Sequence, residues 1–321
     1  MTRGTGGMPR GRARPESIDP DREVRRCREL GVRMVGRDSG LYPELLQTIP
    51  DAPRVLYVRG RLPLMAPALA LVGSRRPSLY GRRMARRFAG DCAAAGIVVV
   101  SGLARGIDAE AHQAALGAGG VTWAVLGSGL DRVYPPENAS LAERIVEAGG
   151  ALVSEVPLGG PPVARNFPLR NRILSGLAWG TVVIEGDGRS GSLITARAAA
   201  EQGREVFAVP GPADAALSEA PHSLLRKGAR IATGLGDVLD ELPRLGVREL
   251  WRPQEPEGSA PARGLSLNEK RIFELLGSHS LSLEDMVSET GWDVPRLVHV
   301  LTEMEGRGFV SPLPGQRYAR T

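Results

Sequence analysis

Several kinds of residue are scarce in this 321-residue chain, and each scarcity excludes a class of protein. The two cysteines, Cys27 and Cys92, are too few for a disulfide framework or a cysteine-based metal site, so both are expected to be reduced thiols. No apolar run reaches the roughly 18 residues of a membrane-spanning helix. The arginines near the start precede no apolar stretch of the kind found in a secretory signal, so we expect a cytoplasmic protein without a membrane partner.

Lysine is almost absent, and the positive charge is carried by arginine. Only Lys227 and Lys270 occur among 41 basic residues, and neither lies in a phosphate-binding Gly-x-x-x-x-Gly-Lys motif. The formal net charge is +5, and residues 1–37 contain ten arginines against five acidic residues. The rest of the chain has 31 basic and 31 acidic residues (41 − 10 and 36 − 5). A polyanion site on the folded body must therefore be a local patch.

Short apolar runs recur along the middle of the chain, with starts roughly 25 to 30 residues apart, the length of a strand and a crossover helix. Because the runs are apolar on both faces, they predict parallel strands covered by helices. The expected fold class is α/β, with a doubly wound, mostly parallel, Rossmann-like sheet. The runs are Ala68–Val72, Ile97–Val100, Val121–Leu126, Ala151–Val153, Thr181–Ile184 and Val206–Val209.

The sequence divides into four parts. Residues 1–40 read as a disordered basic arm with a short helical lead-in, 41–244 as the Rossmann-like domain, and 245–264 as a proline-containing linker. Residues 265–321 predict three capped helices and a hairpin, which is the winged-helix pattern. Its third helix mixes Arg296, His299 and Arg307 with three acidic residues, so contact with protein remains an alternative to reading DNA.

Glycine- and serine-rich loops follow three of the predicted strands. In an open parallel sheet ligands bind beyond the carboxyl ends of the strands, where backbone N–H groups and helix N-termini attract anions. We therefore expect phosphate-binding loops at these positions, with Asp108 as a helix cap or an acceptor that fixes the second loop. The loops are Gly73-Ser74-Arg75-Arg76, Ser101-Gly102-Leu103-Ala104-Arg105-Gly106 and Ser190-Gly191-Ser192.

A second feature combines arginines with an aromatic ring. Arginine supplies charge for phosphate, asparagine a further hydrogen bond and phenylalanine a stacking surface, a combination typical of single-strand binders. A structural ion pair for one of these arginines remains an alternative. The residues are Arg165, Phe167, Arg170, Asn171 and Arg172, in a stretch without acidic residues between Glu155 and Glu185.

Three further features, one helix face and two single side chains, carry predictions. The predicted helix Tyr80–Ala95 presents a stripe of arginines, and the stretch 75–87 contains no acidic residue to pair with them. The stripe is either a basic binding patch or a helix face that points into solvent. Glu185 is placed to orient an arginine. His112 has no second ligand nearby in the sequence and is expected to be a hydrogen-bonded structural residue rather than a metal ligand.

The ordered motifs of residues 42–242 resemble the DNA-processing protein A family (DprA, also called Smf). They are Gly73-Ser74-Arg75, Ser101-Gly102-x-x-x-Gly106-Ile107-Asp108, Tyr134-Pro135, Phe167-Pro168-x-Arg170-Asn171-Arg172, Ser190 to Arg197 and Val206 to Gly211. The resemblance implies a non-enzymatic, cofactor-free homodimer that binds single-stranded DNA, protects incoming strands in natural transformation and helps to load the RecA recombinase. It also implies that Arg75, Phe167, Arg170 and Arg172 line the DNA pocket.

Departures from the family and one rival interpretation accompany this hypothesis. Residues 1–40 are too short and polar for the helical domain that often opens family members, and Ala220-Pro221-His222 stands where Gly-x-Asn is usual. The rival is a nucleoside-monophosphate hydrolase of the lonely-guy type, with Glu185 and Arg172 as its functional pair. The Pro-Gly-Gly-x-Gly-Thr loop of those enzymes is absent from the sequence.

Overall fold

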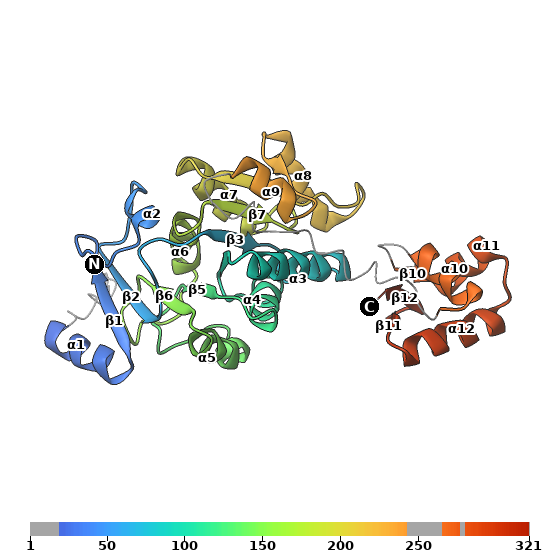
Figure 1. The fold of residues 1–321 in the computed structure, drawn as a ribbon, viewed down its shortest axis with the longest axis horizontal. Coiled ribbons are helices and arrows are strands. Elements are labelled where there is room, and N and C mark those ends of the chain that lie inside the picture. The colour runs from blue at the N-terminus through green and yellow to red at the C-terminus, as the bar shows by residue number, and fades with distance from the viewer. Residues whose placement is uncertain (1–18, 243–264, 277–279, 321) are drawn as a thin grey trace, which may run out of the picture.

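The computed structural model describes residues 19–242, 265–276 and 280–320. Residues 1–18 of the expected arm and the whole expected linker, residues 245–264, lie outside the described residues. The larger domain is built on a nine-stranded sheet with the order β1-β2-β6-β5-β4-β3-β7-β8-β9. In Figure 1 this sheet and its helices lie apart from the smaller C-terminal domain, drawn in orange and red.

The central part of the sheet is parallel, and all six predicted runs form its strands. At one edge β1 and β2 add antiparallel strands, so residues 21–67, which lead into the first parallel strand, dock as part of the sheet itself. We call residues 21–67 the lead-in. The strands are β1 Val32–Gly36, β2 Val55–Gly60, β3 Ala68–Val72, β4 Val98–Ser101, β5 Thr122–Leu126, β6 Ala151–Ser154, β7 Gly180–Val183, β8 Glu205–Ala208 and β9 Arg230–Ile231.

Helices cover both faces of the sheet because the central strands are apolar on both sides. One core cluster packs α3, α4 and α9 against the sheet, and another packs α2, α6 and α7. Met84, Phe88 and Cys92 of α3 point into the first cluster at four-residue spacing. The helices are α1 Pro20–Glu29, α2 Glu44–Gln47, α3 Leu79–Ala94, α4 Ile107–Gly117, α5 Ala139–Glu147, α6 Asn166–Gly176, α7 Ser192–Glu201, α8 Glu219–Arg226 and α9 Leu235–Glu241, with 3₁₀ turns η1 Pro136–Asn138 and η2 Ala216–Ser218.

The direction of winding changes at β3. The chain places β4, β5 and β6 on one side of β3, then returns to place β7 and β8 on its other side. The loops at the carboxyl ends of β3 and β7 lead to helices on opposite faces of the sheet, and in open α/β sheets ligands bind at such a point. We call this carboxyl edge, formed by the loops after β3 to β7, the rim.

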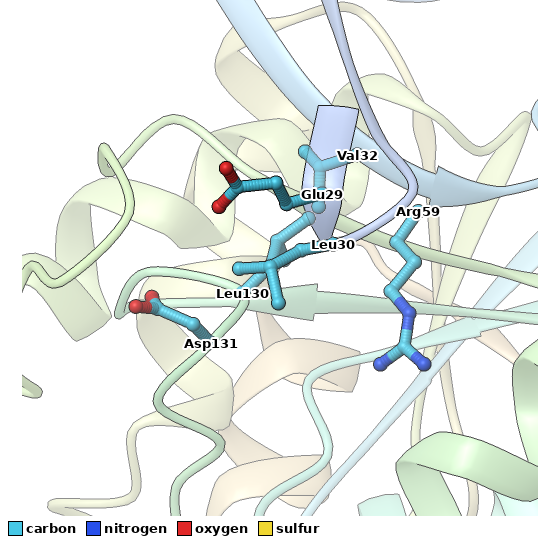
Figure 2. Close-up of a pocket in the computed structure, with 6 residues that line it drawn as sticks. All are labelled: Glu29, Leu30, Val32, Arg59, Leu130 and Asp131. Carbon is cyan, nitrogen blue, oxygen red and sulfur yellow. The ribbon is translucent and has the colours of Figure 1, made fainter. Parts of the chain in front are cut away.

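The end of α1, the first two strands and the loop after β5 line a small open cavity. Figure 2 shows its lining, which comes from the end of α1, from β1 and β2, and from residues Leu130 and Asp131 of that loop. Its volume is about 270 Å³. None of the predicted site residues lines it, so this hollow is not the predicted DNA site.

Residues 265–276 and 280–320 form a winged helix around its own apolar core. Ile272, Met286, Leu297 and Leu301 are fully buried there, and the predicted C-terminal winged helix is confirmed. A short strand that sequence reasoning missed pairs with the hairpin. The elements are α10 Leu267–Leu276, β10 Leu281–Ser282, α11 Leu283–Thr290, α12 Val294–Gly306, β11 Val310–Leu313 and β12 Arg317–Arg320.

Both arginines predicted on the third helix of this domain are already engaged. The guanidinium of Arg296 lies 4.3 Å from the ring centroid of Trp292 and donates to Asn268. Arg307 forms an ion pair of 2.6 Å with the buried Glu269. Because these contacts compete with phosphate for the same groups, they weigh against a DNA-reading helix.

Among the residues whose placement is described, no helix combines the length and apolar character needed to cross a bilayer.

Candidate nucleic-acid interface

The loops after β3 and β4 lie against each other at the rim. The N–H group of Ile107 donates to the carbonyl of Ser74 at 3.1 Å. Gly106 has φ +76°, and a Cβ there would lie 2.3 Å from the same carbonyl oxygen. Only glycine allows this approach without strain. The structure thus brings two of the three predicted glycine-rich loops together.

Arg75 and Arg76 extend from the first of these loops into solvent. Within the described parts of the chain, neither side chain makes a hydrogen bond or ion pair. The N–H group of Arg76 donates to Ser74 Oγ at 3.1 Å, which holds the backbone in a tight turn. Two arginines with free guanidinium groups and a fixed backbone can both bind phosphates.

Arg170 lies beneath the rim and holds two strand ends together. It is 8% exposed, and its Nη1 donates to the carbonyl of Gly102 at 2.7 Å and also to the carbonyl of Val125. Its Nε donates to Asn171 Oδ1 at 3.0 Å. Burial lowers the pKa of Arg170 to about 10, although Asp108 favours the charged form. Arg170 and Asn171 thus tie the carboxyl ends of β4 and β5, and they face the protein rather than the solvent.

The amide groups of the second loop have an internal acceptor. The carboxylate of Asp108 accepts from the N–H groups of Gly102 at 3.1 Å and Ala104 at 3.4 Å. Ser101 is fully buried and donates to the carbonyl of Leu71. Asp108 is therefore the acceptor that fixes this loop, as the sequence suggests, but it occupies N–H groups that the sequence analysis assigns to phosphate.

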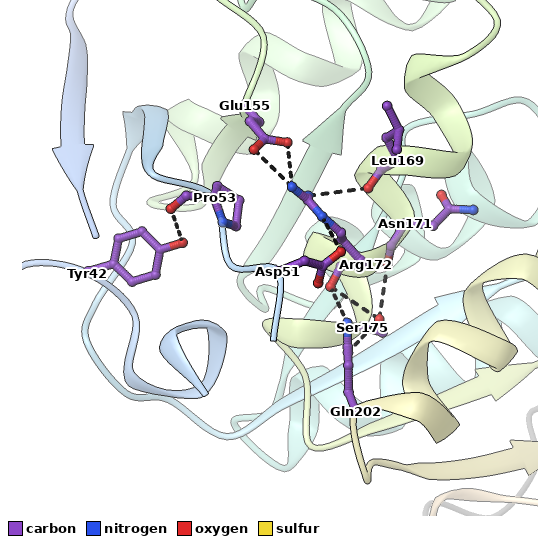
Figure 3. Close-up of polar contacts among 9 residues, drawn as sticks. All are labelled: Tyr42, Asp51, Pro53, Glu155, Leu169, Asn171, Arg172, Ser175 and Gln202. Carbon is purple, nitrogen blue, oxygen red and sulfur yellow. Dashed lines mark hydrogen bonds and ion pairs between the residues drawn. The ribbon is translucent and has the colours of Figure 1, made fainter. Parts of the chain in front are cut away.

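Arg172 is held by two carboxylates that come from distant parts of the sequence. Its Nε lies 2.9 Å from Asp51 Oδ2, and its Nη2 lies 2.8 Å from Glu155 Oε2, as Figure 3 shows. The side chain is 17% exposed. The stretch around Arg172 contains no acidic residue in the sequence, but folding brings Asp51 of the lead-in beside Arg172. The structural ion pair left open in the sequence analysis is formed by Arg172.

An aromatic pair stands at the same rim. The rings of Phe167 and Tyr134 have centroids 5.7 Å apart and are tilted by 55°. A Cβ at Gly127, directly after β5, would lie 3.2 Å from the Phe167 ring, so glycine there leaves room for the ring. Tyr134 is 41% exposed. Sequence analysis named Tyr134 within a motif but did not predict it as a site residue, although an aromatic residue in a loop after a strand is a usable signal.

The polar groups of the third predicted loop largely form hydrogen bonds with one another. The hydroxyl oxygens of Ser190 and Ser192 are 2.8 Å apart, and the N–H group of Ser192 lies 3.3 Å from Ser190 Oγ. Ser192 is 5% exposed, whereas Gly191 is exposed. The N–H group of nearby Gly188 donates to the Glu219 carboxylate at 3.0 Å. These contacts occupy donors that sequence analysis assigns to a phosphate.

Other predicted groups also find partners in the fold. The stripe on α3 is not free of acidic neighbours, because Arg82 and Arg86 each lie 2.9 Å from a carboxylate oxygen of Glu110 on α4. Glu185 does not orient an arginine: it accepts from the N–H and hydroxyl groups of Ser78, the residue that caps α3. In both cases the fold brings in a partner that lies far away in the sequence, which explains both corrections.

Two more arginines of the predicted site differ in whether their side chains already have a partner. Arg105 pairs with Glu137 at the protein surface, whereas Arg165 is exposed and its side chain makes no hydrogen bond or ion pair with a described residue. His112 is fully buried, with Nδ1 2.7 Å from Thr122 Oγ1, so it is the structural residue that was predicted. The groups free to meet a ligand are therefore Arg75, Arg76, Arg165 and the aromatic pair.

Comparison with known proteins identifies the family of the chain. The sequence model of the DNA recombination-mediator protein A family matches residues 33–243, and that of the DprA winged helix domain matches residues 255–316. Protein Smf of Escherichia coli K12 is 44% identical over 286 residues, which cover 88% of this chain and 76% of that protein. DNA processing protein DprA of Bacillus subtilis 168 is 40% identical over 223 residues, 69% of this chain and 75% of that protein.

Two solved structures share the fold. The crystal structure of DprA from Streptococcus pneumoniae has a TM-score of 0.62 and 40% identity, and covers 68% of this chain and 77% of its own. DNA processing protein A from Helicobacter pylori, whose structure concerns its single-stranded DNA binding mode, has a TM-score of 0.59 and 27% identity, with coverages of 66% and 96%. This chain therefore belongs to the DNA recombination-mediator protein A family, the DprA/Smf proteins, with a Rossmann-like domain followed by the family's winged helix.

Proposed function

We propose that this protein binds single-stranded DNA at the rim and acts without catalysing a reaction. The observation that carries the proposal is the position of two free arginines, Arg75 and Arg76, at the edge that also presents the Phe167–Tyr134 pair. Guanidinium groups bind phosphates of any sequence, and an exposed ring stacks on any base. The combination supports binding of unpaired strands with little sequence preference.

The buried part of the site explains why the rim is pre-formed. Arg170 links the loops after β4 and β5 through their carbonyl groups, and Asp108 fixes the amide groups of the loop after β4. A rim held this way loses little conformational entropy when a strand binds. In this proposal Arg170, Asn171 and Arg172 support the site, while Arg75, Arg76, Arg165 and Phe167 contact the strand.

The family gives the proposal its biological setting. Because the related Helicobacter protein has a described single-stranded DNA binding mode, we propose the same ligand class here. We further propose that the protein acts in the cytoplasm as a homodimer, protects incoming or unpaired strands and helps to load RecA during natural transformation or recombination. Two linked sites in a dimer raise the affinity for one long strand without any new contact.

The hydrolase alternative lacks support in the geometry. Its two functional residues would be Glu185 and Arg172, but Glu185 accepts two hydrogen bonds from Ser78. Arg172 is held by Asp51 and Glu155. Incubation with nucleoside monophosphates, followed by chromatography for released base, tests this directly, and release of base would contradict the non-enzymatic proposal.

Titration of the whole protein with oligo-dT and with a duplex of equal length tests the main proposal. Three arginine–phosphate contacts predict a slope of about −2 for log K against log salt concentration on single strands. Light scattering on the same samples measures the mass of the free protein and of the complex. A slope near zero, or tighter binding of the duplex, would contradict the proposal. A mass equal to that of one chain would contradict the proposed homodimer.

A further inference from the structure

The helix α1 is attached to two loops of the rim by buried and partly buried polar contacts. Glu23 is 5% exposed, and its carboxylate accepts from the N–H group of Leu158 at 2.8 Å. One turn later, Arg26 Nη2 lies 2.9 Å from Asp131 Oδ2. The other oxygen of Asp131 accepts from the N–H group of Gly159 at 2.7 Å. Asp131 therefore joins α1 to the loop after β5 and to the loop after β6.

Apolar contacts reinforce this attachment. Cys27 on α1 is 3% exposed and belongs to the same buried cluster as Leu130 and Leu158. The end of α1 and residues Leu130 and Asp131 also line the same cavity, shown in Figure 2. The two loops contact each other directly, because the N–H group of Gly129 donates to the carbonyl of Gly160 at 2.9 Å. The helix and the two loops thus form one packed unit.

These two loops carry the aromatic pair. The loop after β5 leads from Asp131 to Tyr134, and the loop after β6 leads from Gly159 to Phe167 at the start of α6. The 5.7 Å separation of the two rings therefore depends on how the loops lie against each other. Arg75 and Arg76 come from the loop after β3, for which no contact with α1 is found among the described residues.

We propose that α1, through the Arg26–Asp131 ion pair, is a positioning element for the base-contacting rings of the rim, an inference that rests on the proposed function. The ion pair is partly shielded, with Arg26 37% and Asp131 17% exposed. The attraction within a shielded ion pair is weakened less by salt than that within an exposed pair. Removal of Arg26 would leave the Asp131 carboxylate in this shielded place without its counter-charge. A second carboxylate at position 26 would push the loop away from α1 and separate the rings.

The proposal predicts a selective loss. Base stacking depends on the positions of Tyr134 and Phe167, whereas phosphate contacts depend on arginines that α1 does not touch. A change at Arg26 should therefore weaken binding of a strand with bases far more than binding of a strand without them. A general structural defect, or a simple change of net charge, would weaken both.

The experiment compares oligo-dT with an abasic deoxyribose-phosphate oligomer of the same length. Arg26→Glu is expected to lower the affinity for oligo-dT by about tenfold, the loss of roughly one stacked base. The affinity for the abasic oligomer should fall no more than in Arg25→Glu, a matched charge reversal at an exposed neighbour on the same helix. Arg26→Lys should restore oligo-dT binding, because a single contact to Asp131 is enough.

Several outcomes decide the matter. Equal losses of oligo-dT affinity in Arg26→Glu and Arg25→Glu, or equal losses for both ligands in Arg26→Glu, would overturn the positioning role. If Arg26→Glu fails to fold, Asp131→Asn replaces it, because asparagine keeps the acceptor for Gly159 while it removes the ion pair. The same selective loss is then expected, and its absence overturns the inference. Failure of the unchanged protein to bind oligo-dT would instead contradict the proposed function.

Discussion

Arg170 occupies the space that a side chain at residue 102 would need. Its guanidinium nitrogen Nη2 lies 2.3 Å from the place where a Cβ on Gly102 would stand. The same guanidinium donates to the Gly102 carbonyl at 2.7 Å, so the missing side chain and the hydrogen bond belong to one arrangement. A glycine after β4 thus admits the arginine that ties β4 to β5.

Gly102→Ala is expected to destabilise the protein. The added methyl group must displace the buried guanidinium, whose charge-assisted hydrogen bonds are each worth roughly 1.5–3 kcal/mol, so we expect a loss of about 2–4 kcal/mol in the free energy of unfolding. Urea unfolding monitored by circular dichroism measures this. The matched control is Gly90→Ala on α3, where a Cβ meets nothing within 4 Å. The control should stabilise the protein by about 0.5–1 kcal/mol.

Arg75→Ala should weaken the binding of oligo-dT without changing the melting temperature. The side chain is exposed and has no partner among the described residues, so its removal takes away only a phosphate contact. A loss of about 1–3 kcal/mol in binding free energy is expected, and the salt slope should become shallower by about 0.7. Arg197→Ala is the control, because Arg197 is 81% exposed and its ion pair is with Glu201 on the same helix. Equal losses of oligo-dT affinity in the two variants would show that Arg75 does not contact the strand.

Arg172→Ala should have a smaller effect on binding than Arg75→Ala, although the sequence motif treats both as DNA contacts. Arg172 already neutralises two carboxylates, one of them on the lead-in. Its loss should lower the free energy of unfolding by about 1 kcal/mol, because both carboxylates remain partly exposed and solvated. Thermal denaturation and a gel shift with oligo-dT measure the two effects. A loss of affinity as large as that of Arg75→Ala would show that phosphate displaces Asp51 and Glu155.

His112 predicts how stability depends on pH. Burial lowers the pKa of His112 to about 3, so in the folded protein the ring stays neutral where an unfolded histidine takes up a proton. The unfolded state then binds more protons below pH of about 6.5, and stability falls as the pH decreases, by up to about 1.4 kcal/mol per pH unit from this residue alone. Thr122 Oγ1 donates to the Val99 carbonyl and so accepts from the Nδ1–H group of His112.

Unfolding of the unchanged protein and of His112→Asn between pH 6.5 and 5 measures this contribution. Asparagine keeps a donor near the position of Nδ1 but does not titrate, so the slope of unfolding free energy against pH should be shallower in the variant. Its absolute stability is expected to be lower, because the smaller side chain leaves a cavity. Parallel slopes for the two proteins would mean that the buried ring already accepts a proton in this range.

Local pattern determined the fold. Runs such as Ala68–Val72 are apolar on both faces and recur at the length of a strand and a helix, so the parallel sheet could be predicted from the chain alone. The winged helix followed from capping residues such as Ser282 and Asp293, whose effect lies within one turn. The glycine-rich loops at the strand ends were also predicted, because strand direction alone places them at one edge.

Only the tertiary structure decided which side chains remain free at that edge. Whether an arginine meets phosphate or carboxylate depends on groups brought from other parts of the chain, and charge interactions act over distance in space rather than along the sequence. Asp51 lies 121 residues before Arg172, and Asp131 lies 105 residues after Arg26, so no local pattern could reveal either pair. Among the described residues no carboxylate forms an ion pair with Arg75, so its guanidinium group stays available at the rim.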